Sequence, residues 1–162
     1  MSRTITIQPI TPAAFAPFGD LLTTDGDPDR IINQGLCGRF HDRARLDFSD
    51  GRAGLSLFRS DPRALPCRLD MVERHPQGSQ AFIPMTQHPF LVVVAPDETG
   101  APGRPLAFRT EAGQAINIHR GTWHGVLTPL HAPGLFAVID RIGPGANLVE
   151  HWFDTPYTVD TA

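Results

Sequence analysis

The chain has 162 residues, a formal net charge of -3 and 41% hydrophobic residues. This length is typical of one domain and is long enough to bury a core without disulfides, so we expect a single domain over residues 1–162. The small negative net charge gives no basic footprint, so nucleic acid is not expected as a partner. The longest apolar run, Phe90 to Ala95, is too short to cross a membrane, and the N-terminus has no apolar signal core. We therefore expect a soluble, cytoplasmic protein that binds neither nucleic acid nor membrane.

All 14 basic residues are arginine. Without lysine the chain cannot form a side-chain Schiff base, which excludes aldolases and pyridoxal phosphate enzymes of that kind. We expect no organic cofactor. Arginine instead favours bidentate binding of a carboxylate or phosphate group.

One short helix is expected near residues 12–18, close to the N-terminus. Thr11 is suited to the N-cap, Pro12 to the first helical position, and Gly19 to the stop, while Pro17 keeps the helix short.

The rest of the chain has the pattern of short β-strands separated by Gly, Pro and Asp. Strands are expected at residues 4–10, 30–34, 53–59, 67–75, 79–85, 90–96, 106–110, 114–119, 124–129, 134–141 and 148–154, with a surface loop at 95–105. The continuously apolar run at 90–95 is typical of a strand in the middle of a packed sheet. This pattern predicts a mostly β protein, an antiparallel double-sheet jelly-roll barrel.

Two stretches resemble the paired motifs of the cupins, which are small barrels with an interior site. The segment 113–124, "GQAINIHRGTWH", is similar to G-x5-P-x-G-x2-H, with His119 in the usual place of proline and His124 at the metal-ligand histidine. The segment "ERHPQGSQ" is similar to H-x-H-x4-E, with Glu73, His75 and Gln80 in the ligand positions.

These four residues, Glu73, His75, Gln80 and His124, resemble a cupin metal site in which two of four ligands are altered. Glu73 and His75 are two residues apart and would face the same side of a strand, with His124 across the barrel. Imidazole and carboxylate suit a divalent metal such as Ni, Mn, Fe or Zn. Gln80 is a weak neutral ligand, so a metal-free pocket that binds substrate directly stays open as the alternative.

A more specific resemblance covers nearly the whole chain, from "PFGD" to "VIDR". The blocks "INQGLCGRFHD", "ERHPQGSQAFIPM", "HRGTWH" and "VIDR" are similar, in order and spacing, to the ureidoglycolate lyase family, also called ureidoglycolate hydrolases. Gln34 stands where the family has asparagine and Phe40 where it has tyrosine, and neither change removes a candidate catalytic group.

The resemblance implies cleavage of (S)-ureidoglycolate to glyoxylate and urea, a step of allantoin and purine breakdown, and a homodimer. Such cleavage needs a base for the hydroxyl proton and an acid for the departing nitrogen, roles that suit histidine. We assign His75, His124 and Glu73 as catalytic residues. We assign substrate binding to Arg39, which would hold the carboxylate, and to His41, Gln80, His119 and Asp140.

Two other functions remain open at the level of sequence. One is a different metal-dependent cupin enzyme, an isomerase or dioxygenase acting on a small hydroxy acid. The other is a cupin that binds a small ligand without chemistry. The glutamate and glutamine in the ligand set argue against a dioxygenase, which needs a fuller histidine set.

Overall fold

The computed structural model describes residues 2–162 and is mostly β-sheet. Its α-helix, α1 (Pro12–Phe15), begins as the sequence predicts, because the Thr11 side chain accepts a hydrogen bond from the Ala14 amide and Pro12 opens the first turn. The helix is shorter than the expected residues 12–18. Gly19 does not end it but starts the next strand, where a Cβ atom would clash with the Asn117 carbonyl at 2.1 Å.

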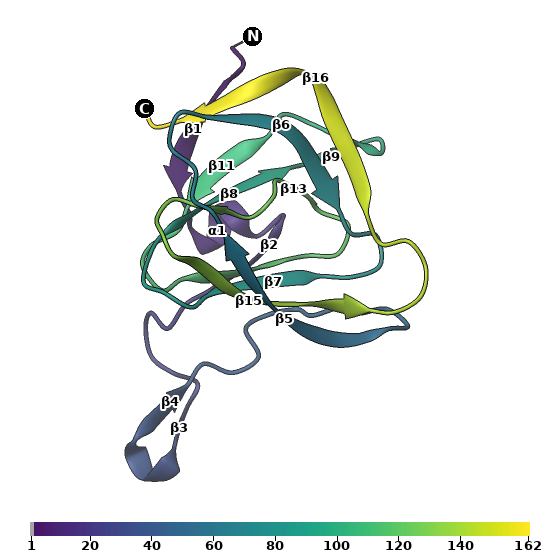
Figure 1. Ribbon diagram of the computed structural model, residues 1–162. Helices are drawn as coiled ribbons and strands as arrows, with labels where there is room; N and C mark the ends of the chain where they lie inside the picture. Colours follow the sequence, from purple (N-terminus) through teal and green to yellow (C-terminus); the bar gives the residue numbers. More distant parts are fainter. Residues whose placement is uncertain (1) are drawn as a thin grey trace.

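The larger sheet closes on itself into a barrel (Figure 1). Its strands, in spatial order, are β11 (Leu106–Arg109), β1 (Thr4–Pro9), β16 (Val149–Asp160), β6 (Cys67–Arg74), β13 (Trp123–His124), β8 (Phe90–Ala95) and β14 (Thr128–Pro129). Pairing between β11 and β8 closes the ring. The strands are antiparallel except that β1 runs parallel to both of its neighbours.

The smaller sheet is fully antiparallel and packs beside the closed one (Figure 1). Its order is β2 (Gly19–Leu22), β12 (Ala115–Ile118), β7 (Gln80–Pro84), β15 (Gly134–Ile142) and β5 (Arg52–Ser60). Two ribbons stand apart from both sheets. They are β3 (Arg30–Ile32) with β4 (Cys37–Arg39), joined by a 3-10 turn at Asn33–Gly35, and β9 (Asp97–Glu98) with β10 (Ala101–Pro102).

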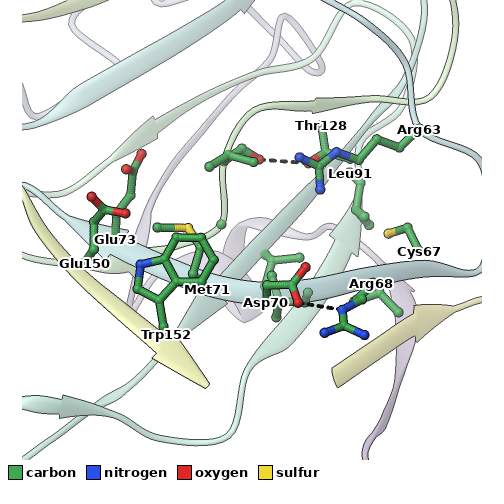
Figure 2. Close-up of a pocket in the computed structure, with 15 residues that line it drawn as sticks. Arg63, Cys67, Arg68, Asp70, Met71, Glu73, Leu91, Thr128, Glu150 and Trp152 are labelled. Atoms are coloured by element: carbon green, nitrogen blue, oxygen red, sulfur yellow. Dashed lines mark hydrogen bonds and ion pairs between the residues drawn. The ribbon is translucent and has the colours of Figure 1, made fainter. Parts of the chain in front are cut away.

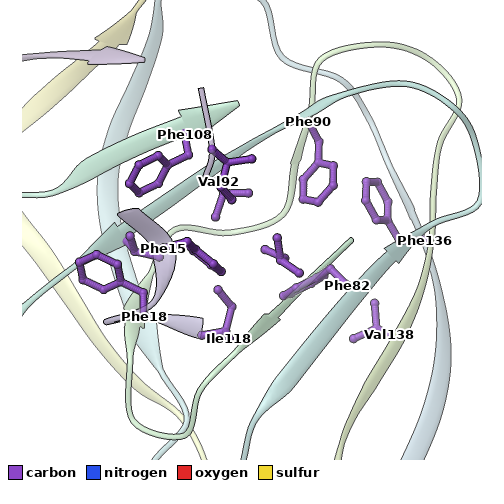
Figure 3. Close-up of a cluster of buried hydrophobic side chains, with 12 residues drawn as sticks. Phe15, Phe18, Phe82, Phe90, Val92, Phe108, Ile118, Phe136 and Val138 are labelled. Atoms are coloured by element: carbon purple, nitrogen blue, oxygen red, sulfur yellow. The ribbon is translucent and has the colours of Figure 1, made fainter. Parts of the chain in front are cut away.

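Strand β8 explains how the two sheets hold together. Phe90, Val92 and Val94 point into a core that lies between the sheets, where Phe90 packs edge-on against Phe136 (Figure 3). The alternate residues, such as Leu91 and Val93, point into a second core whose members all lie on strands of the closed sheet. Because both faces of β8 are buried, its sequence is apolar throughout.

The predicted fold, a mostly β cupin-like double-sheet barrel with one short helix, is confirmed. The expected strand at 124–129 is two short strands, β13 and β14, which both pair with β8. The expected loop at 95–105 contains the small β9–β10 ribbon. Within residues 2–162, no helix has the length and apolar character that crossing a membrane requires.

Candidate active site

The cluster predicted from the cupin motifs comes together beside the core between the sheets, where His124 lies next to Phe82. One ligand atom from each of Glu73, His75 and His124 lies within 4.8 Å of the others. Glu73 is on β6, and His75 follows the end of that strand. His124 was expected across the barrel, but it lies on the neighbouring strand β13, in register with Glu73.

Gln80 and Asp140 extend this cluster from the smaller sheet. They are register partners on β7 and β15, and the Gln80 Nε2 atom donates a hydrogen bond to Asp140 Oδ2 at 3.2 Å. Because an ionised carboxylate can only accept, this bond fixes the side-chain amide of Gln80 with its oxygen turned away from Asp140. That oxygen faces His75, with 3.0 Å between Gln80 Oε1 and His75 Nε2.

Both ring nitrogens of His75 face acceptors. Nδ1 lies 2.9 Å from the Asn147 carbonyl oxygen, and Nε2 faces the Gln80 oxygen that Asp140 has oriented. A carbonyl oxygen accepts but does not donate, so a proton on either ring nitrogen of His75 would meet an acceptor. This geometry suits His75 to donate a proton.

His124 has the opposite character. Its Nδ1 donates to the carbonyl oxygen of Gly125 at 2.9 Å, so its Nε2 carries the lone pair. That Nε2 is buried and has no hydrogen-bond partner among the described residues. A buried, unpartnered acceptor is costly, and here it is aimed into the cluster, where a ligand or metal would satisfy it.

The pKa shifts of His124 and Glu73 agree with this geometry. Burial, and then the neighbouring charge of His75, lower the pKa of His124 from 6.5 to about 4, against the opposing effect of its bond to Gly125. Burial raises the pKa of Glu73, an effect that His75 opposes and Glu150 reinforces. Near neutral pH the cluster thus holds an uncharged His124 and a carboxyl group with raised proton affinity.

The low pKa of His124 predicts a pH-dependent loss of stability. The unfolded chain binds a proton near pH 6.5 while the folded chain resists it down to about pH 4, so this contribution is full above pH 6.5 and is lost as pH falls. Between pH 7 and pH 5, wild type should lose about 1 to 2 kcal/mol more unfolding free energy than His124→Asn. Urea denaturation of both proteins at the two pH values measures the difference, and equal losses would contradict the shift.

Two adjoining cavities open beside the cluster. One, of about 390 Å³, is lined by Glu73 and Gln80 together with Arg59 and Arg63. The other, of about 360 Å³, is drawn in Figure 2, with Glu73 and Glu150 on one side and Arg63 on the other. Both volumes suit a small organic molecule.

Three other residues expected at the site lie elsewhere in the chain. Arg39 and His41 are exposed on or beside the β3–β4 ribbon, which projects from the barrel (Figure 1). The single chain does not bring them to the cluster, and their binding of substrate stays a prediction. His119 does not point to the cluster either, because its Nε2 lies 3.0 Å from Asp20 Oδ1 on β2.

Arg63 is a cavity residue that the sequence did not indicate. It lies on the loop between β5 and β6, outside every recognised motif. In the sequence Arg63 is one of 14 arginines, and nothing in its surroundings distinguishes it from the other 13.

Comparison with known proteins gives the family. Residues 2–160 match the family model described as ureidoglycolate lyase. The chain belongs to the ureidoglycolate lyase family. It is 60% identical to the ureidoglycolate lyase of Rhodobacter capsulatus over 155 residues, which covers 95% of this chain and 96% of the relative. It is 52% identical to ureidoglycolate lyase 2 of Rhizobium meliloti, covering 96% of this chain and 97% of the relative.

The ligand set of this ureidoglycolate lyase family member fits a divalent metal. The Nδ1 atoms of His75 and His124 both face backbone carbonyls, which is the usual support for a histidine that binds metal through Nε2. Glu73 supplies a carboxylate, and the buried Nε2 of His124, which has no hydrogen-bond partner among the described residues, could bind a metal directly. Glu73, His75 and His124 could therefore hold such an ion, with the Gln80 oxygen as a weak fourth ligand.

Proposed function

We propose that this protein cleaves (S)-ureidoglycolate into glyoxylate and urea. The observation that carries the proposal is the full-length likeness to proteins named ureidoglycolate lyase. The cluster supports it, because a proton donor, a carboxyl group of raised proton affinity and a buried acceptor stand together beside cavities of suitable size.

Glu73 is the base in this proposal. The reaction begins when the substrate hydroxyl loses its proton, and a carboxylate whose pKa is raised by burial accepts that proton more readily than an ordinary one. The electrons of the O–H bond then form the carbonyl of glyoxylate, and the bond from carbon to the ureido nitrogen breaks.

His75 is the acid. In the reacting form, a proton on Nε2, the nitrogen that faces Gln80, is delivered to the departing ureido nitrogen, so that neutral urea leaves. Glu73 has then gained one proton and His75 has lost one. Their ligand atoms lie within 4.8 Å of each other, so a proton passed from Glu73 to His75 through one water restores both groups.

His124 orients the substrate. Its low pKa makes it a weak base but keeps it uncharged at neutral pH, with the Nε2 lone pair free. That nitrogen accepts a hydrogen bond from the substrate and holds the reacting carbon beside Glu73.

A divalent metal, held by Glu73, His75 and His124, would polarise the hydroxyl and carboxylate oxygens and lower the pKa of the hydroxyl. His75 cannot bind a metal through Nε2 and carry a proton there at the same time. Metal analysis of the purified protein, with activity measured before and after chelation, therefore separates the two uses of His75.

The test of the proposal is incubation of the pure protein with racemic ureidoglycolate, with glyoxylate followed by its enzymatic reduction. Turnover that consumes one enantiomer supports the proposal. Binding without turnover would favour a ligand-binding cupin, and conversion of other small hydroxy acids alone would favour a different cupin enzyme.

Replacing Asp140 with asparagine should lower kcat about 10-fold, within the range seen when supporting partners of a site are removed. The introduced amide can donate to Gln80 as well as accept from it, so the Gln80 amide is free to turn its nitrogen toward His75. Steady-state kinetics measure the change, with exposed Asp154→Asn as control. Full activity of Asp140→Asn would show that the Gln80 amide needs no such anchor.

We propose one domain, because β8 serves both cores, acting in the cytoplasm as a homodimer. The edge strand β5 supports the dimer, since Leu55 and Leu57 are 70% and 71% exposed there. Apolar side chains in such a row are typical of surfaces that pair with another chain.

A further inference from the structure

The reacting cluster has no permanent cation for a carboxylate. It contains the carboxyl groups of Glu73 and Asp140, which in their ionised form would repel the carboxylate of an α-hydroxy acid. The positive side chain that pairs with the carboxylate of the proposed substrate must therefore be one that lines the cavities beside the cluster.

Three arginines line these cavities. Arg59 and Arg63 line the one beside Gln80, and Arg63 and Arg68 line the other. Arg68 already pairs with Asp70. Arg63 is the one arginine that lines both cavities, as Glu73 does.

The guanidinium of Arg63 is free to bind a carboxylate. Within residues 2–162 its guanidinium makes no hydrogen bond or ion pair, whereas several other arginines are engaged: Arg43, Arg74, Arg104, Arg120 and Arg141. An unpaired guanidinium can offer two parallel N–H groups to a carboxylate, which is the geometry that arginine supplies best.

The backbone of Arg63 is held while its side chain is free. Its amide donates to the Pro129 carbonyl at 2.9 Å, which ties the loop to the end of β14. Pro62 precedes it and Pro66 follows within the same loop, and their fixed φ angles limit how the loop can move. The fixed backbone thus holds the free Arg63 side chain at the cavities that Glu73 also lines.

We infer that Arg63 binds the carboxylate of a small α-hydroxy acid and places the hydroxyl at Glu73. The identity of the substrate rests on the function proposed above, but the carboxylate site can be tested alone. The assignment to Arg63 differs from the expectation that Arg39 holds the carboxylate, because Arg39 lies on the projecting ribbon.

The test compares the binding of glycolate, which has the carboxylate and hydroxyl but cannot be cleaved, with that of glycolamide, its neutral counterpart. Calorimetric titration of wild type should show tighter binding of glycolate. Arg63→Gln should weaken glycolate about 10- to 100-fold, the cost of a lost charged hydrogen-bond pair, and leave glycolamide unchanged. Arg68→Gln, which removes the same charge, should bind like wild type.

Unchanged glycolate binding by Arg63→Gln would overturn the inference. It would also be overturned if wild type did not bind glycolate more tightly than glycolamide. A loss of glycolate affinity seen only in Arg59→Gln or Arg39→Gln would overturn it as well. The proposed function fails separately: wild type that binds glycolate through Arg63 but releases no glyoxylate from ureidoglycolate overturns the activity and leaves the carboxylate site standing. Thermal melting checks that Arg63→Gln, an exposed change, remains folded.

Discussion

His124→Asn is expected to reduce kcat/KM for ureidoglycolate by at least about 100-fold. The asparagine amide can still donate to the Gly125 carbonyl, but it is shorter than imidazole and withdraws the acceptor from the place where Nε2 meets the substrate. Loss of one pre-positioned hydrogen-bonding group in an active site costs ~10²–10³-fold. Steady-state kinetics at pH 7.5 with the purified variant measure the effect.

The melting temperature of His124→Asn should change little at neutral pH, because the substitution removes an unpartnered buried nitrogen as well as packing. His131→Asn, an exposed histidine away from the cluster, is the matched control and should keep full activity. Near-normal turnover by His124→Asn would show that the "HRGTWH" segment is only a turn. Metal analysis of both proteins tells whether the lost group was also a ligand.

Glu73→Gln is expected to lower kcat by at least about 100-fold while raising stability at neutral pH. The amide has the size of the carboxyl group but cannot take the hydroxyl proton, and general-base catalysis contributes ~10²–10⁴-fold. Burial and the nearby Glu150 raise the pKa of Glu73, in spite of His75, which means that the fold disfavours its charged form. Removing that charge should therefore increase the unfolding free energy.

Glu150→Gln is the matched control for this change. It removes the like charge in register with Glu73 on β16 but leaves the base in place, so activity should persist. Kinetics and urea denaturation of the two variants, run together, test the assignment. A Glu73→Gln protein that is both active and more stable would show that Glu73 is not the base.

The fold was predictable because its signals are local. Turn residues divide the chain into strands, and the run "FLVVVA" is apolar throughout because each face of β8 meets a different core. The break between β13 and β14 was not predictable, since it depends on where both strands meet β8. The parallel pairing of β1 likewise depends on contacts with β11 and β16 at the far end of the sequence.

The cluster was predictable because the two cupin motifs place its residues at fixed spacings around strand ends. The structure brings Glu73, His75, Gln80 and His124 together as that spacing indicates. The environment of His119 was not predictable, because its partner Asp20 lies on a strand that only the folded sheet places alongside. Arg63 belongs to no motif, and only the cavities reveal it.

Elimination of intact urea from ureidoglycolate at the Glu73–His75–His124 cluster can be followed atom by atom. The most direct measurement uses ureidoglycolate labelled with ¹³C in the ureido carbon and follows the label by NMR, with glyoxylate measured in parallel. We expect wild type to convert the label into urea, one molecule for each glyoxylate, and His124→Asn to do so at least about 100-fold more slowly. Label appearing as bicarbonate, or equal rates of urea release by the two proteins, would contradict this expectation.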